Sequence, residues 1–312
     1  DGQAKIRKNT TQVSIKSSIV DLDLNSNVSP SVLTQALKKH FNNYLSDTIY
    51  KDSLQPSATM KIDMALHNPP ILKEVFLDGL EQMDSVRLKV DFDESTHQLS
   101  ANLKVLHLQY NEDKLDSLHL NLKGNHENLN FDVGWEQLKT GPLSIPKVSI
   151  NGSLKDQKLT LDFDTFSEGE KLAHIRSEAE MRGDTIRYHV NPEGLVLNRN
   201  SWSIPASNQI IWSKKHVAIT DFNLSLAQQK FILSTSIPGV AKDHLAIVFE
   251  NFNLATFTRF LNTEKVLANG AINGQLVIEN PFNELGLLAD LTIKDLNVSE
   301  IPLGQLTIKM DA

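Results

Sequence analysis

The feature that most constrains this chain is the alternation of apolar and polar residues with a period of two, which recurs from about residue 60 to the last residues. Runs such as Met60-Ile62-Met64-Leu66, Val86-Leu88-Val90-Phe92 and Leu306-Ile308-Met310 place their apolar side chains on one face of a strand. Turn signals separate the runs at roughly the 8–12-residue spacing of hairpins and meanders. They include Lys123-Gly124-Asn125, Asn151-Gly152, Arg182-Gly183-Asp184 and Pro238-Gly239. We therefore predict a mainly β chain built on a large antiparallel sheet system.

Two amphipathic helices are expected before residue ~85. The first follows Ser29-Pro30, an N-cap residue and a proline at the first helical position. The second begins after Asn68-Pro69-Pro70. Neither has a strongly cationic polar face, which favours packing on the sheet over binding to a membrane. We divide the chain into an α+β segment with two helices, 1–95, and an extended antiparallel β region, 96–312. The expected apolar faces are Leu33, Leu37, Phe41, Tyr44, Leu45, Thr48 and Ile49 for the first helix, and Ile71, Leu72, Val75, Phe76, Leu80 and Met83 for the second.

The alternation repeatedly slips by three residues where it should step by two. Three segments share one pattern: apolar, two polar residues ending in Asp or Asn, apolar, Asn, apolar. Asp and Asn tolerate the left-handed and bulged backbone, so each segment is predicted to be a corner that keeps both halves of the strand facing one core. A weaker copy begins at Ile19. The three clear copies begin at Ile219, Phe249 and Ile293.

Charge and cysteine content exclude several classes of protein. The 312 residues include 31 basic and 38 acidic residues, dispersed along the chain, so no basic stripe can neutralise nucleic acid. With no cysteine, the chain has no disulfide, no thiolate nucleophile and no cysteine zinc site. The apolar runs are far shorter than the ~20 residues that span a bilayer. No signal peptide is visible at Asp1-Gly2-Gln3, and we expect the chain to be an excised segment whose anchors lie outside it.

Catalytic patterns are missing from the sequence. Alternate acids at Asp21/Asp23, Asp91/Asp93 and Asp162/Asp164 share one strand face, but the polar side of an amphipathic strand explains them better than an acid/base pair does. His119 and His126 lack a third ligand at a familiar spacing. No hydrolase, nucleotide-triphosphatase or dinucleotide motif occurs. A sugar platform of Trp135, Trp202 and Trp212 is less favoured than three buried or interfacial tryptophans. We predict a protein that is not an enzyme and uses no metal or cofactor.

The C-terminal third resembles the translocation and assembly module family TamB, within the AsmA-like superfamily, in the form found in Bacteroidetes. Residues 190–312 carry the resemblance well, whereas residues 1–189 share only the general pattern of apolar and polar residues. The family's residue pattern is also matched by the segment Asn200-Ser201-Trp202-Ser203-Ile204-Pro205. The specific residues are Val266-Leu267-Ala268-Asn269-Gly270-Ala271-Ile272-Asn273-Gly274-Gln275-Leu276, Asn280-Pro281-Phe282, Ala289-Asp290-Leu291-Thr292-Ile293-Lys294-Asp295-Leu296 and Ile301-Pro302-Leu303-Gly304.

This resemblance implies a long, curled, taco-like or elongated β-sheet with an apolar interior that moves phospholipid across the bacterial periplasm for outer-membrane biogenesis. Family members are anchored in the inner membrane by an N-terminal helix and engage an outer-membrane barrel protein through the far C-terminus. Neither end can be matched to this sequence. Conduction of lipid acyl chains is therefore the share of the function that we expect of this segment.

The candidate lipid groove is lined by strand positions of the C-terminal region that the alternation places on an apolar face. A rival interpretation is a structural or adhesive β-sandwich protein of the cell envelope, in which the same residues form a closed core without a ligand. Alternation alone cannot separate the two. The candidate lining residues are Leu224, Leu226, Phe231, Leu233, Leu245, Ile247, Phe249, Leu276, Ile278, Leu291, Ile293, Leu306 and Ile308.

Overall fold

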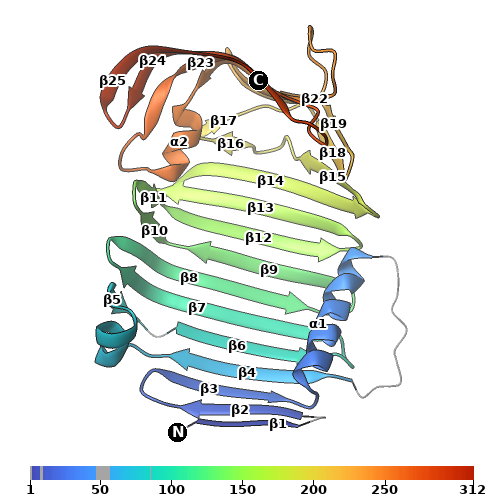
Figure 1. Ribbon diagram of the computed structural model, residues 1–312, viewed down its shortest axis with the longest axis vertical. Helices are drawn as coiled ribbons and strands as arrows, with labels where there is room; N and C mark the ends of the chain where they lie inside the picture. The colour runs from blue at the N-terminus through green and yellow to red at the C-terminus, as the bar shows by residue number, and fades with distance from the viewer. Residues whose placement is uncertain (1, 8–9, 47–56, 85) are drawn as a thin grey trace. The chain divides into compact units, whose positions relative to one another are not determined.

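The computed structural model describes residues 2–7, 10–46, 57–84 and 86–312, and it is mainly β with antiparallel sheets, as predicted (Figure 1). The chain folds as two compact units. Unit 1 comprises Asp1–Gly141 with Lys147–Leu159, and unit 2 comprises Pro142–Pro146 with Thr160–Ala312. The sequence-based division at residue 95 falls in the turn between two strands of unit 1 that pair along eight residues, Val86–Asp93 and Gln98–Val105. Pairing on both sides of this turn holds the two segments in one unit.

Unit 1 is an antiparallel meander in which each strand pairs with the next, apart from two short strands. The short strand β5 (Leu80–Met83) pairs with the C-terminal half of β7, and β10 (Gln137–Thr140) pairs with the N-terminal half of β8. The other strands are β1 (Gly2–Arg7), β2 (Thr10–Lys16), β3 (Val20–Ser26), β4 (Thr59–Leu66), β6 (Val86–Asp93), β7 (Gln98–Tyr110), β8 (Asp113–Gly124), β9 (Asn128–Trp135) and β12 (Lys147–Lys155).

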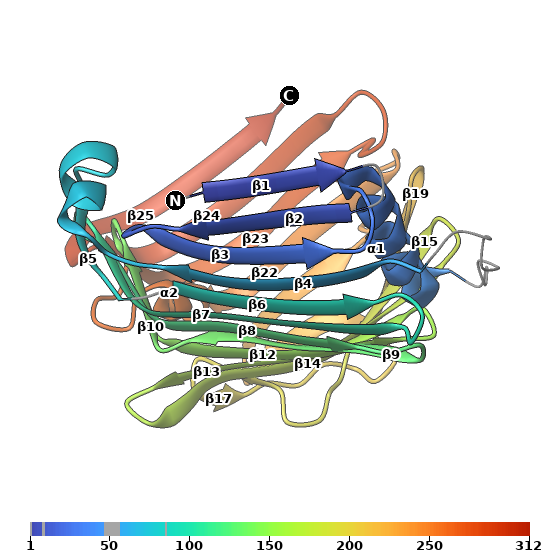
Figure 2. The same ribbon diagram turned by 90° about the horizontal axis from the view of Figure 1, so that it is seen from below.

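Helix α1 (Pro30–Leu45) begins at the predicted proline and packs on the sheet of unit 1. Of its predicted face, Leu33 and Leu37 pack on the core and Tyr44 is buried, whereas Phe41 and Leu45 are partly exposed. Ala36 and His40, which were not predicted, are buried instead. The predicted Thr48 and Ile49 lie outside the described residues. In Figure 2, α1 and the short π-helical turn η1 (Leu72–Phe76) lie at opposite ends of the strands.

The predicted second helix is wrong beyond one turn. Only η1 forms, and Leu80 and Met83 instead belong to β5. The physical reason is that the backbone of residues 80–83 pairs with β7, while Asp78-Gly79 interrupts the helical pattern just before them. Of the predicted stripe, Leu72, Leu80 and Met83 are buried in one cluster, whereas Ile71, Val75 and Phe76 are exposed.

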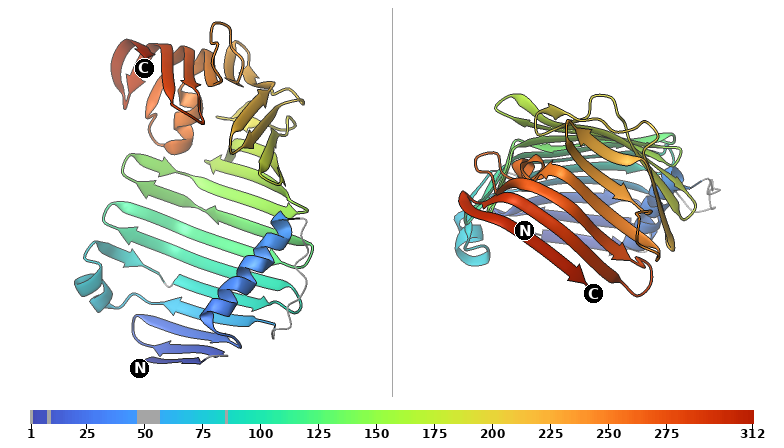
Figure 3. Two further views of the ribbon diagram at one scale, coloured as in Figure 1. Left: turned by 45° about the vertical axis from the view of Figure 1, so that its right-hand side comes forward. Right: turned by 90° about the horizontal axis from the view of Figure 1, so that it is seen from above.

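Unit 2 contains a six-stranded antiparallel sheet in which β20 to β25 pair in sequence order (Figure 3, right). Its strands are β20 (Phe222–Leu226), β21 (Gln229–Ser234), β22 (His244–Asn253), β23 (Ala268–Glu279), β24 (Gly286–Val298) and β25 (Ile301–Asp311). Helix α2 (Ala255–Leu261) follows β22. The remaining strands of the unit are β11 (Leu143–Ile145), β13 (Lys158–Ser167, of which the first two residues are assigned to unit 1), β14 (Glu170–Arg182), β15 (Thr185–Val190), β16 (Val196–Leu197), β17 (Asn200–Ser201), β18 (Gln209–Ser213) and β19 (His216–Thr220).

All three predicted corners are confirmed. Asp221, Asn251 and Asp295 have φ of 48°, 45° and 51°, the left-handed conformation that Asp and Asn tolerate best. The ladders shift register between Phe249 and Phe252 and between Ile293 and Leu296. The apolar residues on both sides of each corner belong to one core. The corner thus keeps them on one face in spite of the three-residue step in the alternation.

The weaker copy at Ile19 is not a corner, because Asp21 lies in the regular ladder of β3 and Ile19 precedes that strand. A bend that was not predicted crosses unit 1, where apolar positions are spaced by three in neighbouring strands. In β7 the pair is Val105 and Leu108, and in β8 it is Leu115 and Leu118 with Ser117 at φ 55° between them. The ladder skips one residue on each strand there, so both halves keep their apolar residues on one face.

The predicted turn at Asn151-Gly152 is also wrong. Both residues lie within β12, where they pair with Asp132 and Phe131. Gly152 is needed for space: the ring of Phe131 lies where a Cβ on residue 152 would be. The other predicted turns, at Gly124, Gly183 and Gly239, do separate strands.

Candidate functional site

The thirteen predicted lining residues lie on one face of the six-stranded sheet of unit 2. Register brings them together in rows across the strands. One row runs Leu224, Phe231, Phe249, Gly274, Leu291 and Ile308, and the next runs Phe222, Leu233, Ile247, Leu276, Ala289 and Met310.

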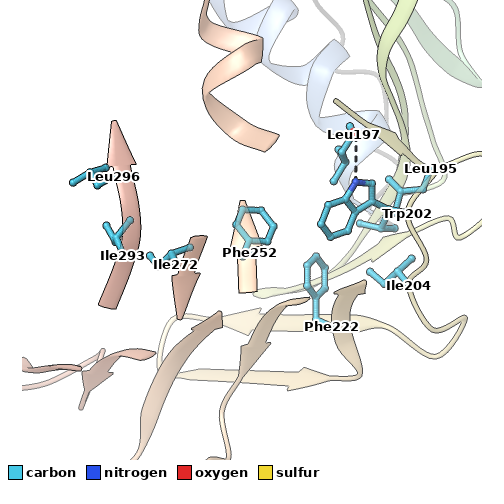
Figure 4. Packing of buried hydrophobic residues seen from close by; sticks show 10 residues of the cluster. Leu195, Leu197, Trp202, Ile204, Phe222, Phe252, Ile272, Ile293 and Leu296 are labelled. Atoms are coloured by element: carbon cyan, nitrogen blue, oxygen red, sulfur yellow. Dashed lines mark hydrogen bonds between the residues drawn. The ribbon is translucent and has the colours of Figure 1, made fainter. Parts of the chain in front are cut away.

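Protein side chains cover part of this face. The buried cluster of unit 2 joins Leu195, Leu197, Trp202 and Ile204, which precede the sheet in the chain, to Phe252 and its neighbours on the sheet (Figure 4). The Trp202 ring lies 5.7 Å from the ring of Phe252, and its Nε1–H donates to the carbonyl of Leu197 at 3.2 Å. Seven predicted lining residues pack in or against this core: Leu224, Leu226, Phe231, Leu233, Phe249, Leu291 and Ile293.

The other six predicted residues lie outside that core. Leu245 pairs with Ile278, and Ile247 pairs with Leu276. These four are half-buried, as is Ile308 on β25, whereas Leu306 on the same strand is exposed. This part of the face is the portion of the predicted groove that the buried core leaves open among the described residues.

A longer apolar row, which sequence reasoning did not select, crosses unit 1. We call it the central row. It passes through eight strands, and every member is aliphatic or methionine. With strands ~4.8 Å apart, it extends for roughly 34 Å. Its members are Ile15, Leu22, Met64, Leu88, Leu103, Leu120, Val133 and Ile150.

The central row lies between two covered regions of the same face. Toward one end of the strands, Val32, Leu33, Ala36 and Leu37 of α1 pack on the sheet. Toward the other end, Leu72 of η1 packs in a separate cluster. Figure 3 (left) shows α1 and η1 toward opposite ends of the strands. Neither cluster contains a member of the row, and all eight members are half-buried. The described residues of unit 1 therefore form an apolar strip with a helical element at each side. The alternation predicted most of these strands, but only their register shows that the eight residues align.

The opposite face of unit 1 is polar and satisfied by its own side chains. Lys61 pairs with Asp91 at 3.3 Å, and Lys89 with Asp63 at 3.2 Å, each across neighbouring strands. These pairs line a shallow depression of about 640 Å³. Opposite charges that neutralise one another across a ladder stabilise it modestly and leave no free acid or base.

The acid pairs considered for catalysis are all engaged as surface partners. Asp23 accepts a hydrogen bond from Ser14, which together with Lys16 lowers the pKa of the carboxyl. In unit 2, Asp162 binds Arg176 at 2.8 Å. Burial opposes ionisation of Asp164, but hydrogen bonds from Lys171 and His174 outweigh it and lower its pKa. Asp93 accepts hydrogen bonds from Ser95 in the adjoining turn. The other acids contact basic side chains across the sheet.

The histidines and tryptophans are also placed separately. His119 contacts Asp132 at 3.0 Å and His126 contacts Glu127 at 3.5 Å, so the two histidines have different partners. Among the described residues, no three metal-ligating side chains gather. Trp202 is buried in its core, whereas Trp212 is largely exposed beside Phe282.

Within the described ranges, no helix is both long enough and apolar enough to cross a bilayer. Comparison of the chain with protein-family models, with curated proteins and with solved structures finds no match.

Proposed function

We propose that this chain is a non-enzymatic segment of a lipid-conducting protein of the bacterial periplasm, which shields phospholipid acyl chains on an apolar β-surface during outer-membrane biogenesis. The observation that carries the proposal is the central row of unit 1, eight apolar residues in register that the buried clusters of the unit leave uncovered. Soluble proteins rarely leave a continuous apolar strip of this kind without a partner.

The energetics favour an acyl chain as that partner. Each methylene withdrawn from water contributes ~0.8 kcal/mol, so a chain of a dozen or more carbons gains roughly 10 kcal/mol along a continuous apolar lining. In the full-length protein, an inner-membrane anchor and an outer-membrane barrel partner would belong to regions outside this chain, as the TamB resemblance implies.

One observation favours the rival function, a structural or adhesive β-protein. The core around Trp202 fills the part of the unit 2 face that includes Phe231 and Phe249, so those positions serve packing between protein segments. The open candidates in unit 2 are consequently Leu245, Ile247, Leu276, Ile278, Leu306 and Ile308.

Photo-crosslinking tests the proposal in cells carrying the full-length protein. A photoreactive residue placed at Leu103 or Leu120 should form covalent phospholipid adducts. The matched controls are Asn102, which precedes Leu103, and Asn121, which follows Leu120. Both face the polar side of the same strands. A second pair is Ile247 against Gln275. Equal labelling of both faces, or adducts at neither, would contradict lipid conduction.

A further inference from the structure

Four large apolar side chains protrude together from the segment that joins β4 to β5 in unit 1. Their exposed fractions are 46% for Ile71, 66% for Val75, 64% for Phe76 and 41% for Leu77. We call these four residues the apolar knob. Single exposed apolar residues are ordinary, but four within seven positions of the chain are a concentrated surface feature.

The knob is held in place by its neighbours. Leu72 is buried with Leu80 and Met83. The Leu72 backbone N–H donates to the Pro69 carbonyl at 2.9 Å, and the Leu77 N–H donates to the Leu72 carbonyl at 2.8 Å. A single inward residue thus anchors the turn while four apolar residues point away from the core.

This arrangement is the reverse of the one found in a helix that serves to cover a sheet. In α1, the apolar residues Val32, Leu33, Ala36 and Leu37 face the core. In η1, most of the apolar residues face outward, so they add no buried apolar surface to unit 1. The water-exposed apolar surface is a cost that an external apolar environment would remove.

We propose that the apolar knob inserts into the interfacial region of a phospholipid bilayer. A protein partner is disfavoured by size, because the exposed parts of four side chains fall short of the ~800 Å² that each partner in a standard complex buries. A convex apolar turn is instead suited to the headgroup and acyl boundary, which shallow apolar side chains enter to a depth of ~5–10 Å.

The charges beside the knob specify which bilayer. Lys73 and Glu74 lie within the turn and Asp78 directly follows Leu77, so the segment carries one basic and two acidic side chains. This balance gives no attraction to anionic headgroups. The bilayer surface that the knob fits is net neutral, such as phosphatidylcholine or phosphatidylethanolamine, and insertion should depend on apolar contact. Docking at the knob needs no lipid in the central row, so it can succeed or fail independently of the proposed function.

A label at a unique cysteine tests the proposal, since the chain contains no other cysteine. Val75→Cys carrying an environment-sensitive fluorophore is mixed with phosphatidylcholine vesicles. We expect a blue-shifted, stronger emission, and the added change Phe76→Ser should weaken partitioning about tenfold or more. The matched control is Leu106→Cys, which is 57% exposed on β7 of the same unit but lies outside the knob.

The proposal would be overturned by no emission change at position 75 or by an equal change at position 106. A change that grows with protein concentration in the absence of vesicles would also overturn it, because it would indicate self-association. So would binding that requires phosphatidylglycerol and disappears with added salt, because it would indicate an electrostatic contact. Because all the altered side chains are exposed, circular dichroism should show the variants folded like the parent.

Discussion

Gly152 of β12 pairs with Phe131 of β9, and the phenylalanine ring lies over the glycine in the space that a Cβ would fill. Replacing Gly152 with alanine should therefore push the ring from its position. We expect Gly152→Ala to lower the free energy of unfolding by about 1–3 kcal/mol, the usual cost of overpacking, as measured by urea denaturation.

A smaller partner at position 131 provides the control for that experiment. Combining Gly152→Ala with Phe131→Val removes the clashing ring, so the two changes together should cost less than the sum of each alone. Additive costs would show that the ring and the glycine are not coupled.

Substitutions at Asp295 test whether the corners depend on a left-handed backbone. Its φ of 51° is accessible to glycine without penalty and is strained for a β-branched residue. Asp295→Val should destabilise unit 2 by about 1–2 kcal/mol, whereas Asp295→Gly should be close to neutral. Lys294→Val, one residue away and outside the left-handed region, is the matched control and should be tolerated. Equal effects of valine at both positions would contradict a conformational origin.

His40 gives unit 1 a pH dependence. Burial, with a smaller effect of His97 and an opposing one of Glu94, lowers its pKa from 6.5 to about 4. The folded state therefore prefers the neutral ring, and this contribution is fully present above pH 6.5 and lost as the pH falls toward 4. The shift corresponds to roughly 3 kcal/mol.

The variant His40→Gln isolates this effect. The His40 ring lies 2.9 Å from Tyr44 Oη, which donates to the Asn125 carbonyl at 2.6 Å, so glutamine keeps a donor but cannot titrate. Urea midpoints measured between pH 7.5 and 4.5 should fall more steeply for the parent than for the variant. Parallel slopes would show that another group governs the loss of stability.

Leu99 and Leu103 distinguish an open apolar strip from a closed core. Both are on the same face of β7, but Leu99 is buried beneath α1 and Leu103 belongs to the central row. We expect Leu99→Ala to cost about 2–5 kcal/mol, as core truncations do, and Leu103→Ala to cost clearly less. Equal losses in urea denaturation would indicate that the strip is part of a closed core and would favour the structural rival.

Local preferences made much of the fold predictable. The corner at Asn251 was predictable because the left-handed preference of asparagine and the three-residue slip appear together in the sequence. The bend at Ser117 carries the same slip without that residue preference and was not recognised. Helix prediction failed at Leu80 because pairing with Tyr110 of β7, 30 positions away in the chain, outweighed the local pattern.

The candidate site was less predictable, because it depends on what covers each face. Phe231 and Ile247 follow the same alternation, yet Phe231 packs against a core containing Trp202 and Ile247 does not. The central row is equally invisible before pairing is known, since Leu22 and Ile150 align only through the strands between them.

The corners also determine the parity of each strand, that is, whether odd- or even-numbered residues face the core. In β24 the core-facing residues are Leu291 and Ile293 before the corner and Leu296 after it, so the parity changes at Asp295. If the backbone straightened here into a regular strand with all its residues kept, Leu296 would move to the polar face while every side chain stayed chemically unchanged. A one-residue deletion at a corner would restore the period of two and keep the apolar set on one face, whereas a one-residue deletion within a regular stretch would reverse it. Natural variation in length should therefore fall at the corners and in the turns between strands.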